Sequence, residues 1–194
     1  MIILADPVTH DDMEMIYGTA EILKREGCEL VTVILTRLPF SRQDRDFGTR
    51  QAIQVKNEIG KLAMDVDQLI VVEPHSQEII REGLETGLPV MGFSAWKLMA
   101  NKAREILGDD FKDVVGVLPD NGRMSIGIEM GTFLGCGVVA TETNRDPVTG
   151  KKVVTLSDES KAVLEAVLGS LGLVFEDIVS TGGTLVRLGE AVRT

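Results

Sequence analysis

The feature that most constrains the fold is a regular alternation of two kinds of segment. Apolar, β-branched runs of the kind found in buried strands are expected at 30–35, 69–72, 88–91, 114–118, 137–140, 153–154 and 171–175. Between them, apolar residues recur at helical spacing over 11–26, 51–64, 95–107, 124–134 and 158–169, and a last helix is expected after Gly183. Strands that alternate with helices form parallel sheets flanked by helices, so the sequence predicts an α/β fold.

The strand–helix series falls into two runs that meet near residue 92, without a Gly-, Pro- or Ser-rich linker between them. Two packed α/β lobes are therefore expected, 1–92 and 93–194, with helices on both faces of each sheet. Two local signals support the helix boundaries. Residues Thr9 to Asp12 resemble a capping box, and Ser157 is a suitable N-cap for the helix expected at 158–169.

Charge and hydropathy exclude several classes of function. The chain has thirty acidic and twenty basic residues, which gives a net charge of −10. The electrostatic field of this negative charge repels phosphate-rich polymers, so no nucleic-acid partner is expected. No apolar run approaches the roughly 18 residues of a membrane span, and the first residues lack a basic flank, which predicts a cytoplasmic protein without a membrane segment. Cys28 and Cys136 lie far apart and are expected to be buried free thiols.

The segment from Leu173 to Leu185 is the most informative in the chain. An apolar strand runs into two adjacent carboxylates, Glu176 and Asp177, and then into the small-residue loop 180–184, which opens a helix. Glycines let backbone N–H groups approach an anion, the helix N-terminus adds its dipole, and the hydroxyls add donors. An ordinary strand–turn–helix connection with solvated acids is the plain alternative, but the ordered combination favours a site for a sugar phosphate.

A second segment, Leu38 to Arg45, follows an expected strand and reads Leu-Pro-Phe-Ser-Arg-Gln-Asp-Arg. Its two arginines, Arg42 and Arg45, place two guanidinium groups on one loop, where they can each donate a pair of hydrogen bonds to a triphosphate. A solvated, charged loop is the alternative interpretation.

Together these segments resemble the PRPP (phosphoribosyl diphosphate) synthetase family, which has the fold of type I phosphoribosyltransferases. The first is similar to the family's PRPP motif, and the second closely resembles its Pro-Tyr-Ala-Arg-Gln-Asp-Arg segment. Further similar segments occur in the family's order: 11–15 at the start of the first long helix, 72–79 at an Asp-Leu-His-x-x-Gln-Ile stretch, 88–90 at the crossing between lobes, and 118–122 at a Ser-Pro-Asp-x-Gly loop.

The resemblance implies a role for each matched residue, Mg²⁺ as cofactor and a homo-oligomer. It implies binding of the sugar phosphate by Glu176, Asp177, Ser180, Thr181, Gly182, Gly183 and Thr184. It implies binding of the nucleotide by Arg42, Gln43 and Arg45, a metal role for His75, and catalytic roles for Arg145 and Asp120.

The sequence also departs from the family. The resemblance starts after the family's N-terminal segment with its Phe-x-x-Gly-Glu signature, so part of the nucleotide site is expected to be missing. The position of a family lysine is Thr143, although Lys151 and Lys152 lie just past the next turn. A family Lys-Arg-Ala is replaced by Ser-Ile-Gly at 125–127. The part of the site expected to bind the sugar phosphate is thus retained, whereas the part expected to bind ATP lacks several of the family's residues.

Three functions are consistent with this pattern. The first is a PRPP synthetase-like transferase that binds ribose 5-phosphate or PRPP, in which the C1 hydroxyl of ribose 5-phosphate attacks the β-phosphorus of ATP. The second is a non-catalytic regulatory paralogue that binds the sugar phosphate. The third is a phosphoribosyltransferase that uses PRPP.

Overall fold

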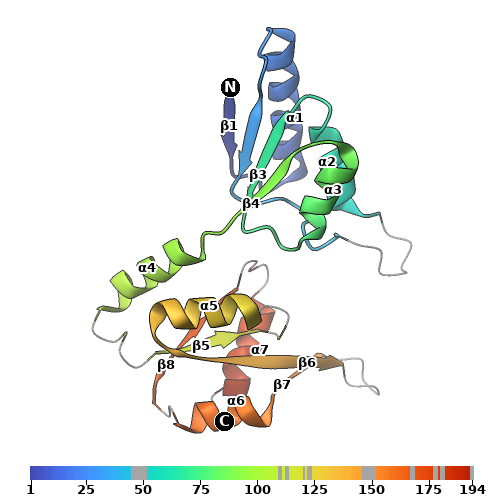
Figure 1. Cartoon of the computed structure of the whole chain (residues 1–194). Helices are drawn as coiled ribbons and strands as arrows, with labels where there is room; N and C mark the ends of the chain where they lie inside the picture. The colour runs from blue at the N-terminus through green and yellow to red at the C-terminus, as the bar shows by residue number, and fades with distance from the viewer. Residues whose placement is uncertain are drawn as a thin grey trace. The chain divides into compact units, whose positions relative to one another are not determined.

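The structure is a computed structural model that describes residues 1–44, 52–108, 111, 114–119, 121, 124–145, 152–166, 169–176, 179 and 182–192. The chain divides into two compact units, Met1–Ala95 and Trp96–Thr194, which Figure 1 shows in blue to green and in green to red. None of the described helices is long and apolar enough to cross a membrane.

The first unit holds a four-stranded parallel sheet whose strands follow one another in chain order, β1-β2-β3-β4. Its elements are β1 (Ile2–Ala5), α1 (His10–Arg25), β2 (Thr32–Leu35), α2 (Gln54–Leu62), β3 (Gln68–Val72), α3 (Glu78–Thr86) and β4 (Val90–Phe93). After each helix, the next strand is added beside the previous strand, always at the same edge of the sheet. Because such crossovers are right-handed, all three helices are brought to one face of the sheet (Figure 1).

The packing follows from this order. The register aligns Ile3, Val33, Leu69 and Val90 in one row across the four strands. This row lies in a single core to which α1, α2 and α3 all contribute, through residues such as Met13, Ile59 and Ile79.

None of the helices described within this unit lies on the opposite face of its sheet. The register aligns Leu4, Ile34, Ile70 and Met91 in the neighbouring row. Alternate side chains of a strand point to opposite faces, so this row, with Ile2 and Phe93, forms a second apolar surface. We call it the open face: Ile2, Leu4, Ile34, Ile70, Met91 and Phe93. The expectation of helices on both faces is therefore wrong within this unit, because its sequential strand order brings its own helices to one face.

The second unit holds a sheet of order β7-β6-β5-β8. Its elements are α4 (Trp96–Leu107), β5 (Val114–Leu118), α5 (Met124–Leu134), β6 (Gly137–Arg145), β7 (Lys152–Leu156), α6 (Asp158–Ala166), β8 (Leu171–Val174) and α7 (Gly183–Val192). Strands β6, β5 and β8 are parallel, and β7 pairs with β6 in an antiparallel hairpin.

Both faces of this second sheet are covered. On one face, Leu118 and Ala140 pack with Trp96 of α4 and Met130 of α5. On the other, Val117 and Val139 pack with Leu188 of α7 and with residues of α6. Parallel sheets flanked by helices are thus confirmed as the fold class, and the β6–β7 hairpin is the antiparallel exception.

Helix α5 packs closely on side chains of its sheet at two glycines. A Cβ atom on Gly131 would lie 2.3 Å from Val138 Cγ2, and one on Gly127 would lie 2.3 Å from Leu118 Cδ1. The Ser-Ile-Gly sequence at 125–127 therefore includes a glycine that the packing of α5 requires.

Several local predictions are confirmed. Thr9 and Asp12 form the capping box of α1, with the Asp12 N–H donating to Thr9 Oγ1 at 3.2 Å and the Thr9 N–H donating to Asp12 Oδ2 at 2.8 Å. Ser157 accepts from the Ser160 N–H at 3.2 Å. Strand β6 runs five residues beyond the predicted end because β7 pairs with it. The sequence did not predict β1 or α3.

Candidate functional site

The segment with the twin carboxylates begins where β8 ends. Phe175 is buried, its N–H donates to the Val117 carbonyl at 3.0 Å, and its ring meets that of Trp96 edge-on at 6.2 Å. These contacts fix the chain one residue before Glu176, at the carboxyl end of a parallel strand. In open α/β sheets, ligands bind at this end of the strands.

The loop after β8 ends in a helix N-terminus. Gly182 has a φ of +73°, which favours glycine, and its carbonyl accepts the Val186 N–H at 3.1 Å. Helix α7 begins at Gly183, and Leu188 anchors it in the core. The first amides of a helix have no partner within it, so the N–H groups that follow Gly182 are available to an anion, with the exposed Thr184 beside them.

Some residues predicted for this site lie outside the described residues: Asp120, Asp177, Ser180 and Thr181. Of the predicted sugar-phosphate residues, the structure describes Glu176, Gly182, Gly183 and Thr184, and all four belong to the β8–α7 connection.

In the first unit, the predicted nucleotide residues lie on loops that leave neighbouring strands. Arg42 and Gln43 follow β2, and His75 follows β3, with which β2 pairs in parallel up to Leu35 and Val71. Arg42 and Gln43 are exposed, whereas Ser41 and Asp44 on either side of them are buried. The Gln43 N–H donates to the Phe40 carbonyl at 2.7 Å, closing the turn. Arg45 lies outside the described residues.

Backbone strain marks the same two loops. Phe40 and Glu73 have φ angles of 60° and 48°, and they are the non-glycine residues with positive φ in the described part of the chain. Glu73 is held there because its N–H donates to the Phe93 carbonyl at 2.9 Å and its carboxylate accepts the Ala95 N–H. Each such conformation costs about 1–3 kcal/mol and is typical of functional loops.

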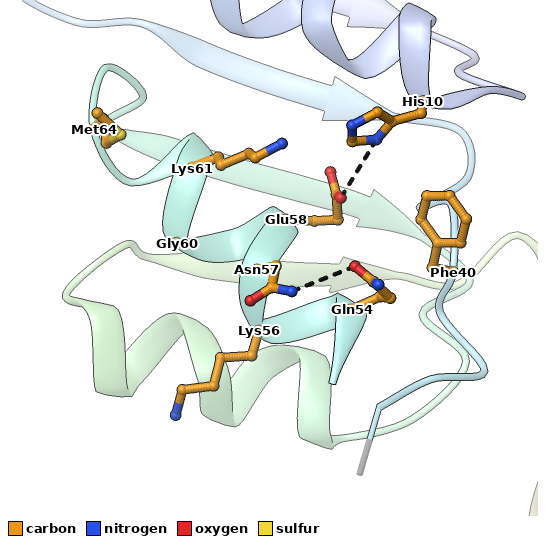
Figure 2. Close-up of a pocket in the computed structure, with 9 residues that line it drawn as sticks. All are labelled: His10, Phe40, Gln54, Lys56, Asn57, Glu58, Gly60, Lys61 and Met64. Atoms are coloured by element: carbon orange, nitrogen blue, oxygen red, sulfur yellow. Dashed lines mark hydrogen bonds and ion pairs between the residues drawn. The ribbon is translucent and has the colours of Figure 1, made fainter. Parts of the chain in front are cut away.

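An open cavity of about 720 Å³ lies beside the Phe40 loop (Figure 2). It is lined by His10, Phe40, Gln54, Lys56, Asn57, Glu58, Gly60, Lys61 and Met64. The His10 and Phe40 rings meet at 6.3 Å between centroids and form one side of it. Its other lining residues come from α2 and the end of that helix.

The polar centre of this cavity is Glu58, which is only 1% exposed. Its Oε2 accepts a hydrogen bond from the Tyr17 hydroxyl, and its Oε1 lies 3.9 Å from His10 Nδ1. Burial and the hydrogen bond to Glu58 raise the pKa of Tyr17 well above its ordinary value, so Tyr17 stays a donor. A buried carboxylate facing a histidine can accept a hydrogen bond from a bound group.

This cluster was not predicted, although the sequence contains a signal for it. Glu58 occupies a buried position of α2, between Val55 and Leu62 on the helix face that packs on the sheet. A carboxylate within an apolar helical stripe is rarely buried without a partner. Lys61 pairs with Glu14 at 3.0 Å and lies 5.1 Å from the Tyr17 ring centre, so it ties α2 to α1.

A second arginine near the strand ends is already paired. Arg37 donates to both carboxylate oxygens of Asp6, at 2.7 and 3.0 Å, and Thr36 donates to the same carboxylate. Hydrogen bonds from Arg37 and Thr36 hold the pKa of Asp6 below its ordinary value. Arg37 therefore links the residues that follow β1 and β2.

The remaining predicted catalytic residue, Arg145, is the last residue of β6. Across the hairpin its Cα partner is Lys152, and that of Thr143 is Val154. Within the described ranges, no three His, Cys, Asp or Glu side chains gather into a group that could hold a metal ion.

Comparison with known proteins identifies relatives of the whole chain. No protein-family model matches it. A ribose-phosphate pyrophosphokinase of Saccharolobus solfataricus is 30% identical over 169 residues, which cover 87% of this chain and 54% of that protein. One from Aquifex aeolicus is 28% identical over 189 residues, or 94% of this chain and 55% of the relative.

The fold agrees with these relatives. A crystal structure of phosphoribosylpyrophosphate synthetase from Mycobacterium smegmatis matches with a TM-score of 0.79 at 23% identity, covering 99% of this chain and 59% of that one. The chain thus spans little more than half the length of the proteins it matches. It is a divergent relative of the ribose-phosphate pyrophosphokinases and shares their fold.

Proposed function

We propose that the chain binds ribose 5-phosphate or PRPP at the connection between β8 and α7. The observation that carries the proposal is the geometry of this connection: a left-handed Gly182 leads directly into a helix whose first amides have no partner within the helix. Its relatives are named for a ribose-phosphate substrate, which fits an anion site of this kind.

Each residue of the connection has a defined part. The amides of Gly183 and Thr184, with the hydroxyls of Thr184 and Thr181, would hold the 5-phosphate, and the positive end of the helix dipole would stabilise its charge. Gly182 keeps the backbone free of side chains where the phosphate approaches. Ser180 would add a donor. Glu176 and Asp177 would accept hydrogen bonds from the ribose hydroxyls.

We further propose that the loops of the first unit serve the nucleotide. Arg42, Gln43 and Arg45 would bind the phosphates of ATP, with His75 beside them. In the reaction, the C1 oxygen of ribose 5-phosphate forms a bond to the β-phosphorus, the bond from that phosphorus to the α-phosphate oxygen breaks, and AMP leaves. Asp120 would lie on the C1 side, and Arg145 would stabilise charge on the transferred diphosphate.

Mg²⁺ fits the donors that the β8 end offers. This ion prefers oxygen ligands and is held by one or two carboxylates together with substrate phosphates. Glu176 supplies such a carboxylate at the end of β8, and Asp177 follows it. These two residues would hold the ion, which when bound neutralises diphosphate charge.

A regulatory, non-catalytic role is the second candidate, and one observation favours it. Thr143, at the position of the family lysine, lies inside the β6–β7 hairpin, where its Cα partner is Val154. A missing cation at a diphosphate would cost several orders of magnitude in rate. Binding of the sugar phosphate without release of AMP would identify this function.

Isothermal titration calorimetry tests the site. Ribose 5-phosphate, titrated into the full chain with Mg²⁺, should bind, and Thr184→Val should weaken the affinity at least about tenfold, because one hydrogen bond to a charged group is lost. The matched control is Thr132→Val on α5, whose exposed hydroxyl donates only to the Ile128 carbonyl. Equal affinities for the wild type and Thr184→Val would refute the assignment.

A further inference from the structure

The cavity beside the Phe40 loop contains a buried carboxylate with one oxygen left over. Glu58 lines the cavity although it is only 1% exposed, and its side chain is directed toward His10 (Figure 2). Its Oε2 accepts the hydrogen bond from the Tyr17 hydroxyl. Its Oε1 lies 3.9 Å from His10 Nδ1, which is beyond hydrogen-bond distance, and makes no hydrogen bond to any other described residue. This oxygen is therefore the one that a bound group would meet.

The charges around this carboxylate do not balance. Lys61 also lines the cavity, but it pairs with Glu14 at 3.0 Å, so its charge is already matched. In the part of the chain that the structure describes, His10 is the one basic side chain within 4.0 Å of Glu58, and it is charged only when protonated. A buried carboxylate is costly unless a positive charge or further hydrogen bonds compensate it. With His10 neutral, the cavity lacks one positive charge.

The hydrogen bond from Tyr17 determines which kind of cation fits. A guanidinium group binds a carboxylate best when both oxygens accept its paired N–H groups. Here Tyr17 occupies Oε2 of Glu58, so a single oxygen remains for the ligand. An ammonium group is a compact charge that can donate to one oxygen alone. The site therefore favours a primary amine over a guanidine.

The surroundings of Glu58 suit a cation that carries an alkyl chain. The rings of His10 and Phe40 meet edge-on at 6.3 Å between centroids on one side of the cavity. Aromatic rings attract organic cations that approach their faces. Met64, two residues past the end of α2, adds an exposed and adaptable apolar side chain to the lining. An alkyl group attached to the amine would therefore have apolar contacts.

We propose that this cavity binds a small primary ammonium ion. An N–H group of the ion would donate to Glu58 Oε1, the rings of His10 and Phe40 would lie beside its charge, and Met64 would contact its alkyl chain. The half-exposed His10 side chain can turn aside to admit it. The site is independent of the function proposed above, because none of these residues is assigned to the sugar phosphate or to the nucleotide.

Histidine-ring NMR of the full chain tests this site. The sequence has two histidines, of which His10 lines the cavity and His75 does not. A titration with n-propylammonium chloride at about pH 8, where imidazole side chains are ordinarily neutral, should shift the ring signal of His10. The shift should saturate with a Kd of about 1 mM, which so small a ligand can reach. The signal of His75, assigned by its loss in His75→Gln, should stay unchanged.

Two further ligands separate the charge from the hydrogen bond in the wild type. Tetramethylammonium carries the same charge without an N–H donor, and n-propanol carries the same alkyl chain without a charge. Neither should produce a saturable shift of the His10 signal over the same range of concentrations. Because this comparison needs no variant, it decides the question even if a substitution at Glu58 prevents folding.

A substitution tests the role of the carboxylate itself. Glu58→Gln should weaken binding of n-propylammonium at least about tenfold, because the hydrogen bond to the ligand loses its charge. The matched control is Glu21→Gln, at an exposed position of α1 that pairs with Arg25 and lies outside the cavity lining, and it should bind like the wild type. Circular dichroism establishes that each variant is folded.

Several results would overturn the proposal. One is a His10 signal that does not respond to n-propylammonium at up to about 20 mM. Another is an equal response to tetramethylammonium or n-propanol, or a parallel shift of both histidine signals. Unchanged affinity in folded Glu58→Gln, or an equal loss of affinity in Glu21→Gln, would also refute a site at Glu58.

Discussion

The two sheets have the same number of strands but are covered differently. In the first, the strands follow chain order and all three helices share one core with one face of the sheet. In the second, β6 and β8 pair with opposite edges of β5, and separate apolar clusters cover the two faces of the sheet. Strand order therefore determines which face of a sheet its own helices bury, because apolar residues occur on both faces of both sheets.

Four leucines test this comparison with one substitution. Leu69, Leu118 and Leu188 are fully buried, on the covered face of the first sheet and on the two sides of the second, whereas Leu4 lies on the open face. Leucine to alanine should lower the free energy of unfolding by about 2–5 kcal/mol at the three buried positions. At Leu4, measured in dilute urea titrations of the monomer, the loss should stay near 0.5 kcal/mol. A loss at Leu4 equal to that at Leu69 would show that the open face is covered.

Two helical glycines, one in each unit, test how closely a helix packs on its sheet. Gly131→Ala should cost about 1–3 kcal/mol, because its Cβ would meet Val138 on the sheet. The control is Gly18→Ala in α1, where no atom lies within 4 Å of the added Cβ, and which should gain about 0.5–1 kcal/mol. Thermal unfolding of both variants measures the difference. If both changes stabilise the protein, the close contact of α5 is wrong.

The capping box of α1 predicts a smaller effect. Thr9→Ala removes the hydroxyl that accepts the Asp12 N–H, and should lower the free energy of unfolding by about 1 kcal/mol. Thr132→Val, on the exposed surface of α5, serves as the control in the same urea titration. Equal midpoints for Thr9→Ala and the wild type would contradict the capping role.

Acid should affect the first unit more than the second. Hydrogen bonds hold the pKa values of Asp6, Asp12 and Asp67 below the ordinary 3.8, and in the part of the chain that the structure describes these lowered carboxyl groups all belong to the first unit. A lowered folded pKa stabilises the fold above the ordinary value, and that stability is lost as pH falls through the folded pKa.

The chain supplies one optical probe for each unit in this experiment. The single tyrosine, Tyr17, lies in the first unit, and the single tryptophan, Trp96, in the second. As pH falls below about 4, the urea midpoint reported by Tyr17 absorbance should decrease more than that reported by Trp96 fluorescence. Parallel decreases in the two midpoints would contradict the prediction.

What could be predicted from the sequence depended on how local the signal was. The capping box at Thr9 and the helix 124–134 follow from neighbouring residues, and both are confirmed. Strand β1 was missed because it is four residues long and lies at the start of the chain. The extension of β6 to Arg145 depends on pairing with β7, which no local pattern encodes.

The candidate site shows the same limit. The order of the motifs led to the β8–α7 connection and to Arg42 and His75, since each lies beside a strand. Glu58 could not be assigned in this way, because its partners Tyr17 and His10 come from α1, more than 40 residues away in the chain. The bare face of the first sheet likewise depends on strand order, which hydropathy alone does not reveal.

Backbone amide NMR during a titration with ribose 5-phosphate examines the sugar-phosphate site most directly. On a ¹⁵N-labelled chain with Mg²⁺, the largest shifts should fall on the amides of Gly183 and Thr184, because these N–H groups would donate to the phosphate. Saturable shifts that leave these two amides unchanged, or no shifts at millimolar ligand, would contradict a sugar-phosphate site at the start of α7.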